Sequence, residues 1–423
     1  MAINGTSTNF PKFEDGDVSI VVSTSRIYIL HSNVLRRVSK YFKNIFDTSD
    51  PPRLTAAARR EGYTPWRFQL YQDHNHPNDR GQFFSMPIGE SGKVHGQNNI
   101  PPRGPSTTMS GEDDDKCWDW LFGCFYGITP DFDSSTFGAT VNDCFVLMDC
   151  ADTISAVDHV REVVDLALMR QDEVLWKSIA GIPTVWAELG RRVRSPAIFK
   201  EAVIHIVGKW KMLDHESKDQ LPKDIQKLCK KKWDELELAK RAIEIRIAGH
   251  YPPFLCRNHA DKPHRTAYAN DIYSWTALSY FRQYLAQSGN DSTNRQAEDG
   301  GYAWYKAFSK GADAYLDHEA MREFHTFFPM SSKACSVLEA HMNVLKEDIK
   351  DFVKDLMVVR THVDPATLEG AGKPWLTCTV VEKGDLPWVV MEEGEQGNGF
   401  NALAQEAMRV EETGMEADDE DDE

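Results

Sequence analysis

The order of elements between Asp17 and Phe46 constrains the fold of this chain more than any other feature. Two β-branched runs, at residues 18–23 and 26–30, are separated by only two residues, which predicts a hairpin. Apolar residues then recur at a spacing near 3.6 up to Phe46, which predicts an amphipathic helix capped by Ser32. A third strand is predicted at residues 66–71.

Residues 72–116 differ in composition from the sequence on either side. They contain polar and proline-rich clusters, such as residues 73–79 and 101–105, and end in an acidic run. Such a stretch has too little apolar surface to offset the entropy lost on ordering. We therefore expect a disordered insertion, after which an aromatic helix at residues 118–127 resumes the fold.

From about residue 170 onward the sequence has the periodicity of helices. The predicted helices cover residues 172–189, 196–212, 222–248, 271–287, 302–328 and 332–360. Two apolar runs, at residues 375–381 and 388–390, are compatible with a small edge hairpin.

These patterns predict four regions. The fold class is an α+β N-terminal domain, a small sheet with helices, followed by a mostly α-helical C-terminal region. The predicted boundaries are a flexible N-terminus at 1–14, the α+β domain at 15–169, the helical region at 170–390 and an acidic disordered tail at 391–423.

The charge of the chain is concentrated in its tail. Residues 392–423 hold thirteen acidic residues and one basic residue, Arg409, and so carry −12 of the net charge of −17. This balance disfavours nucleic acid as a partner, because phosphate binding needs a cationic surface.

No apolar run approaches the roughly 18 residues of a membrane span, and the first residues lack the features of a secretory signal. Eight scattered cysteines without a C-x-x-C pair favour the reducing cytoplasm or nucleus.

No motif in the sequence commits the chain to catalysis. His318-Glu319 begins like a zinc-protease motif, but Arg322 stands where the second histidine is required. A lysine run, residues 230–232, is compatible with a nuclear-import or nucleic-acid patch and with the solvated face of a long helix. We expect no catalytic residue and no cofactor.

One group of residues has the donor types of a metal site. Four nitrogen or sulfur donors lie within fifteen residues, namely His250, Cys256, His259 and His264. Their spacings match no standard zinc finger, and neighbouring prolines indicate a loop. The prediction is therefore no bound metal, with zinc as the alternative.

The first 169 residues resemble the BTB/POZ family. Asp17-Val18 opens the first strand, Leu30-His31-Ser32 joins the second strand to the helix, and residues 39–46 have the family's Ser-x-Tyr-Phe-x-x-hydrophobic-Phe pattern. The segments around residues 68–70 and 125–127 are similar to later elements of the family. The resemblance covers about a quarter of the chain.

The resemblance implies a non-catalytic protein-interaction domain that dimerises or holds partners. It implies that Asp17 and His31 are framework residues at the junction between strand and helix. The candidate partner or dimer surface then lies on the first helices, although these apolar groups also suit a core: Val34, Leu35, Tyr41 and Phe42.

The resemblance also raises the question of cullin binding. Ligase adaptors of the family often carry a hydrophobic-x-Glu motif, but here Arg59 takes the hydrophobic position before Glu61. We therefore expect an intracellular scaffold or adaptor that binds protein partners, among them a second copy of itself. The alternatives are a substrate adaptor of a cullin-based ubiquitin ligase and a nuclear, chromatin-associated regulator.

Overall fold

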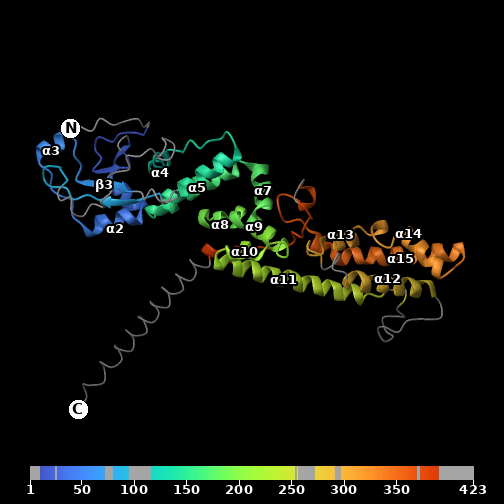
Figure 1. Cartoon of the computed structure of the whole chain (residues 1–423). Coiled ribbons are helices and arrows are strands. Elements are labelled where there is room, and N and C mark those ends of the chain that lie inside the picture. Colours follow the sequence, from blue (N-terminus) through green and yellow to red (C-terminus); the bar gives the residue numbers. More distant parts are fainter. Residues whose placement is uncertain are drawn as a thin grey trace, which may run out of the picture. The chain divides into compact units, whose positions relative to one another are not determined.

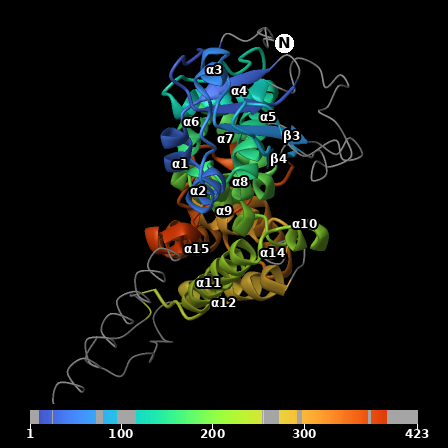
Figure 2. The same ribbon diagram turned by 90° about the vertical axis from the view of Figure 1, so that its left-hand side faces the viewer.

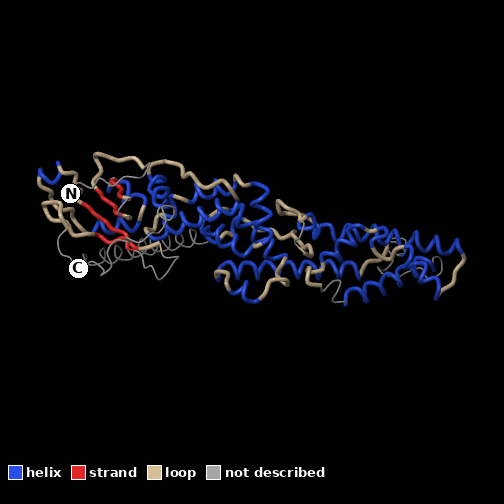
Figure 3. The backbone as a smooth tube through the Cα atoms, turned by 45° about the horizontal axis from the view of Figure 1, so that its top comes forward, coloured by secondary structure: helices blue, strands red, loops and turns tan. Residues whose placement is uncertain are grey.

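The chain divides into two compact units, residues 1–175 (unit 1) and residues 176–423 (unit 2). The computed structural model describes residues 10–23, 26–71, 80–94, 116–252, 255, 272–290, 297–368 and 372–389 (Figure 1). The described strands all belong to unit 1, and unit 2 is built from helices and loops (Figure 3). Among the described residues, no helix combines the length and the apolar character that a bilayer crossing requires.

Unit 1 combines four short strands with helices. Its elements, in chain order, are β1 (Val18–Val21), β2 (Ile27–Leu30), α1 (Ser32–Val38), α2 (Lys40–Thr48), α3 (Ala56–Arg60), β3 (Trp66–Tyr71), β4 (Gln82–Ser85), α4 (Lys116–Phe125), α5 (Phe137–Thr153), η2 (Val157–His159) and α6 (Arg161–Met169). Helix α7 (Asp172–Gly181) then leads into unit 2.

The strands form one mixed sheet in the order β2-β1-β3-β4. Strand β1 is antiparallel to β2 and parallel to β3, so that Val18 lies opposite both Leu30 and Trp66. Strand β1 has a neighbour on each side, and all four of its residues are buried. The predicted small sheet followed by a mostly helical region is confirmed.

Strand β4 differs from the sequence-based expectation, because it lies inside the segment predicted to be a disordered insertion. It pairs antiparallel with β3, and Phe83 on it is buried against Trp118 with a ring-centroid distance of 4.9 Å. Pairing and aromatic packing therefore order residues 80–94 despite their polar composition. The rest of the predicted insertion up to residue 115 lies outside the described residues.

The strands of unit 1 lie among its helices (Figure 2). The core of this unit is a cluster of buried aromatic side chains. The Phe42 ring meets Phe68 edge to face at 4.9 Å, and the Trp118 ring stacks against Phe122 at 5.9 Å. Such large apolar groups contribute most of the burial that stabilises a domain of this size.

Unit 2 is helical throughout its described length. Its elements after α7 are α8 (Pro183–Val193), α9 (Pro196–Gly208), α10 (His215–Asp219), α11 (Lys223–Ala248), α12 (Ile272–Asn290), α13 (Tyr302–Lys310), η4 (Ala312–Ala314), α14 (His318–Phe327), α15 (Ser332–Val353), η5 (Lys354–Met357), η6 (Pro365–Thr367) and η7 (Lys383–Asp385).

Two of the predicted helices are interrupted. The helix predicted at 172–189 ends at Gly181, and Pro183 begins a new one, as expected where proline removes a backbone donor. The helix predicted at 302–328 breaks at Gly311, whose φ of 62° is left-handed and is accessible to glycine at little cost. Helix α15 packs against α11, α12, α13 and α14 and forms the spine of this part of unit 2.

The described segment after α15 does not form the small edge hairpin with which its sequence is compatible. Residues 372–381 form no strand, and Trp375 lies fully buried, with its Nε1 donating to His205 Nδ1 on α9 at 3.1 Å. The Lys209 ammonium lies 4.0 Å from the centre of the Trp375 ring. The apolar runs are therefore used to cover α9 instead of pairing with each other.

A buried carboxylate on α9 holds the same segment. Glu201 accepts a hydrogen bond from the backbone N–H of His362 at 2.8 Å, and its Oε2 lies 3.0 Å from His362 Nδ1. Because the Trp375 indole donates to Nδ1 of His205, the neutral imidazole carries its proton on Nε2, which lies 3.4 Å from Glu201. The His362 ring also stacks on Trp176 at 3.8 Å.

Candidate protein-interaction site

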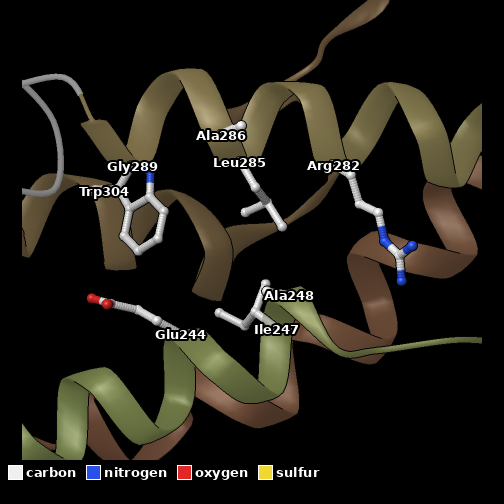
Figure 4. Close-up of a pocket in the computed structure, with 8 residues that line it drawn as sticks. All are labelled: Glu244, Ile247, Ala248, Arg282, Leu285, Ala286, Gly289 and Trp304. Carbon is white, nitrogen blue, oxygen red and sulfur yellow. The ribbon is translucent and has the colours of Figure 1, made fainter.

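An open pocket in unit 2 is the candidate site. It has a volume of about 560 Å³ and lies where the C-terminal end of α11 faces α12 and α13 (Figure 4). We call it the α11–α12–α13 groove, and its lining residues are Glu244, Ile247, Ala248, Arg282, Leu285, Ala286, Gly289 and Trp304.

The middle of the groove is apolar. Ile247 and Trp304 are buried and Leu285 is half-buried, whereas the short side chains of Ala248 and Ala286 are exposed on opposite walls (Figure 4). The Trp304 indole is fixed in place, because its Nε1 donates to Ser288 Oγ at 3.1 Å. An apolar floor between small residues leaves room for the side chains of a bound segment.

The two ends of the groove carry opposite charges. Figure 4 shows Glu244 near Trp304 at one end and Arg282 at the other. The Glu244 carboxylate accepts from the hydroxyl of the buried Tyr305 at 2.5 Å. Arg282 Nη1 donates to the Tyr251 hydroxyl at 3.0 Å, and the guanidinium lies 4.3 Å from the centre of that ring. Both charged groups are therefore oriented by aromatic neighbours.

A buried lysine stabilises the helix spine behind the groove. Lys346 on α15 is 2% exposed, and its Nζ donates to the carbonyl oxygens of Ala312 and Leu316 at 2.7 and 2.9 Å. Burial lowers the pKa of Lys346 from its ordinary value. These bonds tie the connection after α13 to α15, which fixes the position of α13 and of Trp304 on it.

The framework residues inferred from sequence lie close together in unit 1. The Asp17 carboxylate accepts from the backbone N–H of Ser32 at 2.6 Å at the start of α1. The backbone N–H of His31 donates to the Tyr126 hydroxyl at 3.0 Å, and its Nε2 lies 3.1 Å from Asp15 Oδ1. Their structural role therefore remains a prediction, with these contacts as its support.

The residues inferred to form a partner surface point mostly inward. Leu35 and Phe42 are fully buried, while Val34 and Tyr41 are half-buried, and the Tyr41 hydroxyl donates to the carbonyl of Phe83. Their role in partner binding stays a prediction. The basic side chains beside them line a separate pocket of about 510 Å³, among them Arg36, Arg37, Lys40 and Lys43.

The lysine run and the metal candidates have ordinary partners where they are described. Lys232 pairs with Asp385 at 2.8 Å, and Lys230 pairs with Asp234 at 2.9 Å. His250 Nε2 lies 2.9 Å from Asp348 Oδ2, and the other three metal candidates lie outside the described residues. Within the described part of the chain, no three His, Cys, Asp or Glu side chains could hold a metal ion.

Sequence reasoning did not single out the groove. Its members come from three helices whose approach is set by tertiary packing, and no spacing in the sequence brings Glu244, Arg282 and Trp304 together. The sequence signal for the groove is weak: an aromatic residue on one predicted helix and a charged residue near the end of another. Both features are common in helical proteins.

The comparison with family models found a match to part of the chain. Residues 252–355 match the FF domain model of fungi, a protein-interaction module, and this match covers about a quarter of the chain. The comparisons with curated proteins and with solved structures found no match.

The BTB/POZ assignment made from the sequence is wrong. The family models return the FF domain and no BTB/POZ domain. The strand–strand–helix order on which the assignment depended is a local pattern, since short apolar strands and a serine-capped helix occur in many α+β folds. The groove includes α12 and α13, which lie within the matched residues, and the end of α11 just before them.

Proposed function

We propose that this chain is a non-catalytic protein-interaction protein whose α11–α12–α13 groove binds a segment of a partner protein. The observation that carries the proposal is an open pocket with an apolar floor, formed largely by residues that match a protein-interaction domain. A helix groove of this kind typically binds apolar side chains of a partner peptide and excludes water from them.

The absence of catalysis and the cellular location belong to this proposal. The charged groups of the groove, Glu244 and Arg282, lie at opposite ends of it, so they do not form an acid–base pair around a common point. The described cysteines are free thiols, which favours the cytoplasm or nucleus. The comparisons give no support to BTB-mediated dimerisation or to a cullin-adaptor role, so neither is included.

Filling the groove is expected to remove partner binding. Ala248→Trp places an indole over the floor between Ile247 and Leu285, and we expect it to lower partner recovery at least tenfold. The control is Ala242→Trp, because Ala242 is exposed on the same helix and does not line the groove. Proximity labelling in cells with quantitative mass spectrometry measures recovery for the wild type and both variants.

The comparison between the two variants decides the proposal. Partners that bind in the groove are lost with Ala248→Trp and retained with Ala242→Trp. If partner recovery is the same for the wild type and for both variants, the partners bind outside the groove and the proposal is wrong. Peptides of this same chain among the groove-dependent partners would identify a second copy as the occupant.

A further inference from the structure

Unit 1 has a pocket that the proposed function does not use. It has a volume of about 510 Å³ and is lined by residues of α1, of the first turn of α2 and of the segment 155–159. We call it the α1–α2 pocket. Its wall carries four exposed cationic side chains, Arg36, Arg37, Lys40 and Lys43.

The charge of this wall is predominantly positive. Asp158 is the one carboxylate among the described residues that line the pocket, and it pairs with Arg161. Arg36 Nε lies 3.3 Å from Asp47 Oδ1, but both side chains are about half exposed, and an exposed pair is weak enough for a multiply charged ligand to displace it. Several cations around one pocket therefore favour a ligand with more than one negative charge.

Buried hydrogen bonds fix the shape of the pocket. Ser39, between α1 and α2, is 2% exposed, and its hydroxyl donates to the carbonyl of Ile154 at 2.6 Å and accepts from the backbone N–H of Phe42 at 3.2 Å. The backbone N–H of Lys40 donates to the carbonyl of Ser155 at 3.4 Å. These bonds join the start of α2 to the end of α5, so a ligand meets a wall that is already formed and loses less entropy on binding.

The uncharged lining residues indicate the body of the ligand. The described lining includes no Phe, Tyr or Trp, and its one aliphatic side chain, Val38, is buried. A nucleobase or an apolar side chain therefore finds little surface on which to stack or pack. Asn33 and Ser155 are exposed and polar, and their side chains form hydrogen bonds with hydroxyl groups.

We propose that the α1–α2 pocket binds a polyol that carries several phosphate groups, with Arg37, Lys40 and Lys43 on the phosphates and Asn33 on the hydroxyls. Arginine forms paired, charge-assisted hydrogen bonds with phosphate, and lysine adds a compact charge on a flexible stem. Free inositol phosphates and phosphoinositide lipid headgroups share this chemistry, and the test separates these two sources.

Isothermal titration calorimetry of the full-length chain with inositol hexakisphosphate is the first test. All carboxylates of the protein then compete with the probe. Asn33→Trp fills the pocket without a change in charge, and we expect it to lower the affinity at least about tenfold. Asn44→Trp is the matched control, because Asn44 is exposed on α2 and does not line the pocket, and it should retain the affinity of the wild type.

A pair of double variants tests the role of the charges. Arg37→Gln with Lys40→Gln is expected to lower the affinity at least about tenfold, as for the loss of hydrogen bonds between charged groups. Arg59→Gln with Arg60→Gln removes the same charge from exposed positions on α3 outside the pocket, and it should have little effect. Circular dichroism checks that each variant is folded.

Vesicle flotation separates the two sources of the ligand. Phosphatidylcholine vesicles that contain phosphatidylinositol bisphosphate should recover the wild type and not Asn33→Trp if the pocket takes a lipid headgroup. Vesicles with phosphatidylserine in place of the phosphoinositide control for surface charge. Binding of inositol hexakisphosphate without recovery on vesicles assigns the pocket to a free polyol phosphate. Either result supports the proposal.

Three results would overturn the proposal. Neither probe binds the full-length chain, or both bind the wild type and Asn33→Trp equally well, which places the ligand outside the pocket. The third is tighter binding of a short single-stranded RNA that Asn33→Trp abolishes, which identifies nucleic acid as the ligand. None of these results bears on the groove of unit 2, so the proposed function is tested separately.

Discussion

Replacing Phe42 with alanine is expected to destabilise unit 1 by about 3–5 kcal/mol. The Phe42 side chain is fully buried and its ring meets Phe68 at 4.9 Å and Phe46 at 6.0 Å. Its removal therefore deletes a large apolar group and leaves a cavity between α2 and the sheet. Hydrogen exchange followed by mass spectrometry should show β1 and β3 amides exchanging about a hundred- to several thousand-fold faster, since every 1.4 kcal/mol is a factor of ten.

Tyr41→Phe is the matched control for this prediction. It keeps the ring and removes only the hydroxyl that donates to the Phe83 carbonyl, which should cost about 1 kcal/mol. If Phe42→Ala left exchange in unit 1 unchanged, Phe42 would not be part of the core. If Phe42→Ala changed partner binding alone, Phe42 would have the surface role that was inferred from the sequence.

Glu201→Gln is expected to destabilise unit 2 by about 2–4 kcal/mol. The carboxylate is 3% exposed and accepts from the backbone N–H of His362, with the His362 imidazole also within hydrogen-bond distance. A glutamine offers one acceptor oxygen in place of two. Its amide group, which donates hydrogen bonds, then faces a group that donated to the carboxylate. Pulse proteolysis in urea should then cleave residues 358–368 at a lower urea concentration than in the wild type. The same midpoint for both proteins would show that Glu201 does not hold this segment.

The same group of residues predicts how stability depends on pH. Burial holds the pKa of His205 below its ordinary value of 6.5, so the unfolded chain takes up a proton there that the folded chain does not. The contribution of the neutral His205 to the free energy of unfolding should be present at pH 7 and should decline as the pH falls below about 6.5. Burial by itself raises the pKa of Glu201, but contacts with His205 and His362 outweigh it and lower the pKa below 4.5. A second loss should therefore begin below about pH 4.5.

The pH dependence has its own control. His205→Asn keeps an acceptor for the Trp375 indole and removes the titrating imidazole, so the decline that begins near pH 6.5 should become shallower. Urea midpoints measured between pH 4 and pH 8 test this. An identical decline in the variant would assign the pH dependence to other groups.

The sheet shows how much of unit 1 could be predicted. Alternating and β-branched residues marked β1, β2 and β3, since each of these strands carries its own signal. Strand β4 had no such signal, because Phe83 is ordered by contact with Trp118 across a long stretch of sequence. Local composition cannot report a contact between residues that are distant along the chain.

The helices of unit 2 could be predicted from their apolar periodicity, but the groove between them could not. Periodicity indicates which face of α11 or α12 is apolar, and it does not indicate which helix covers that face. The groove depends on where α13 begins after the turn at Gly301 and on how Lys346 holds the connection after it. These are tertiary contacts, and so the candidate site became visible only in the structure.

A photo-crosslinking amino acid placed at Ala286 tests most directly whether the α11–α12–α13 groove holds a partner segment. Ala286 is exposed on the groove wall opposite Ala248. We expect crosslinks in cells to one short segment of a partner protein, and we expect Ala248→Trp to eliminate them. The same crosslinks in the presence of Ala248→Trp, or no more than those obtained from position 242, would contradict the account.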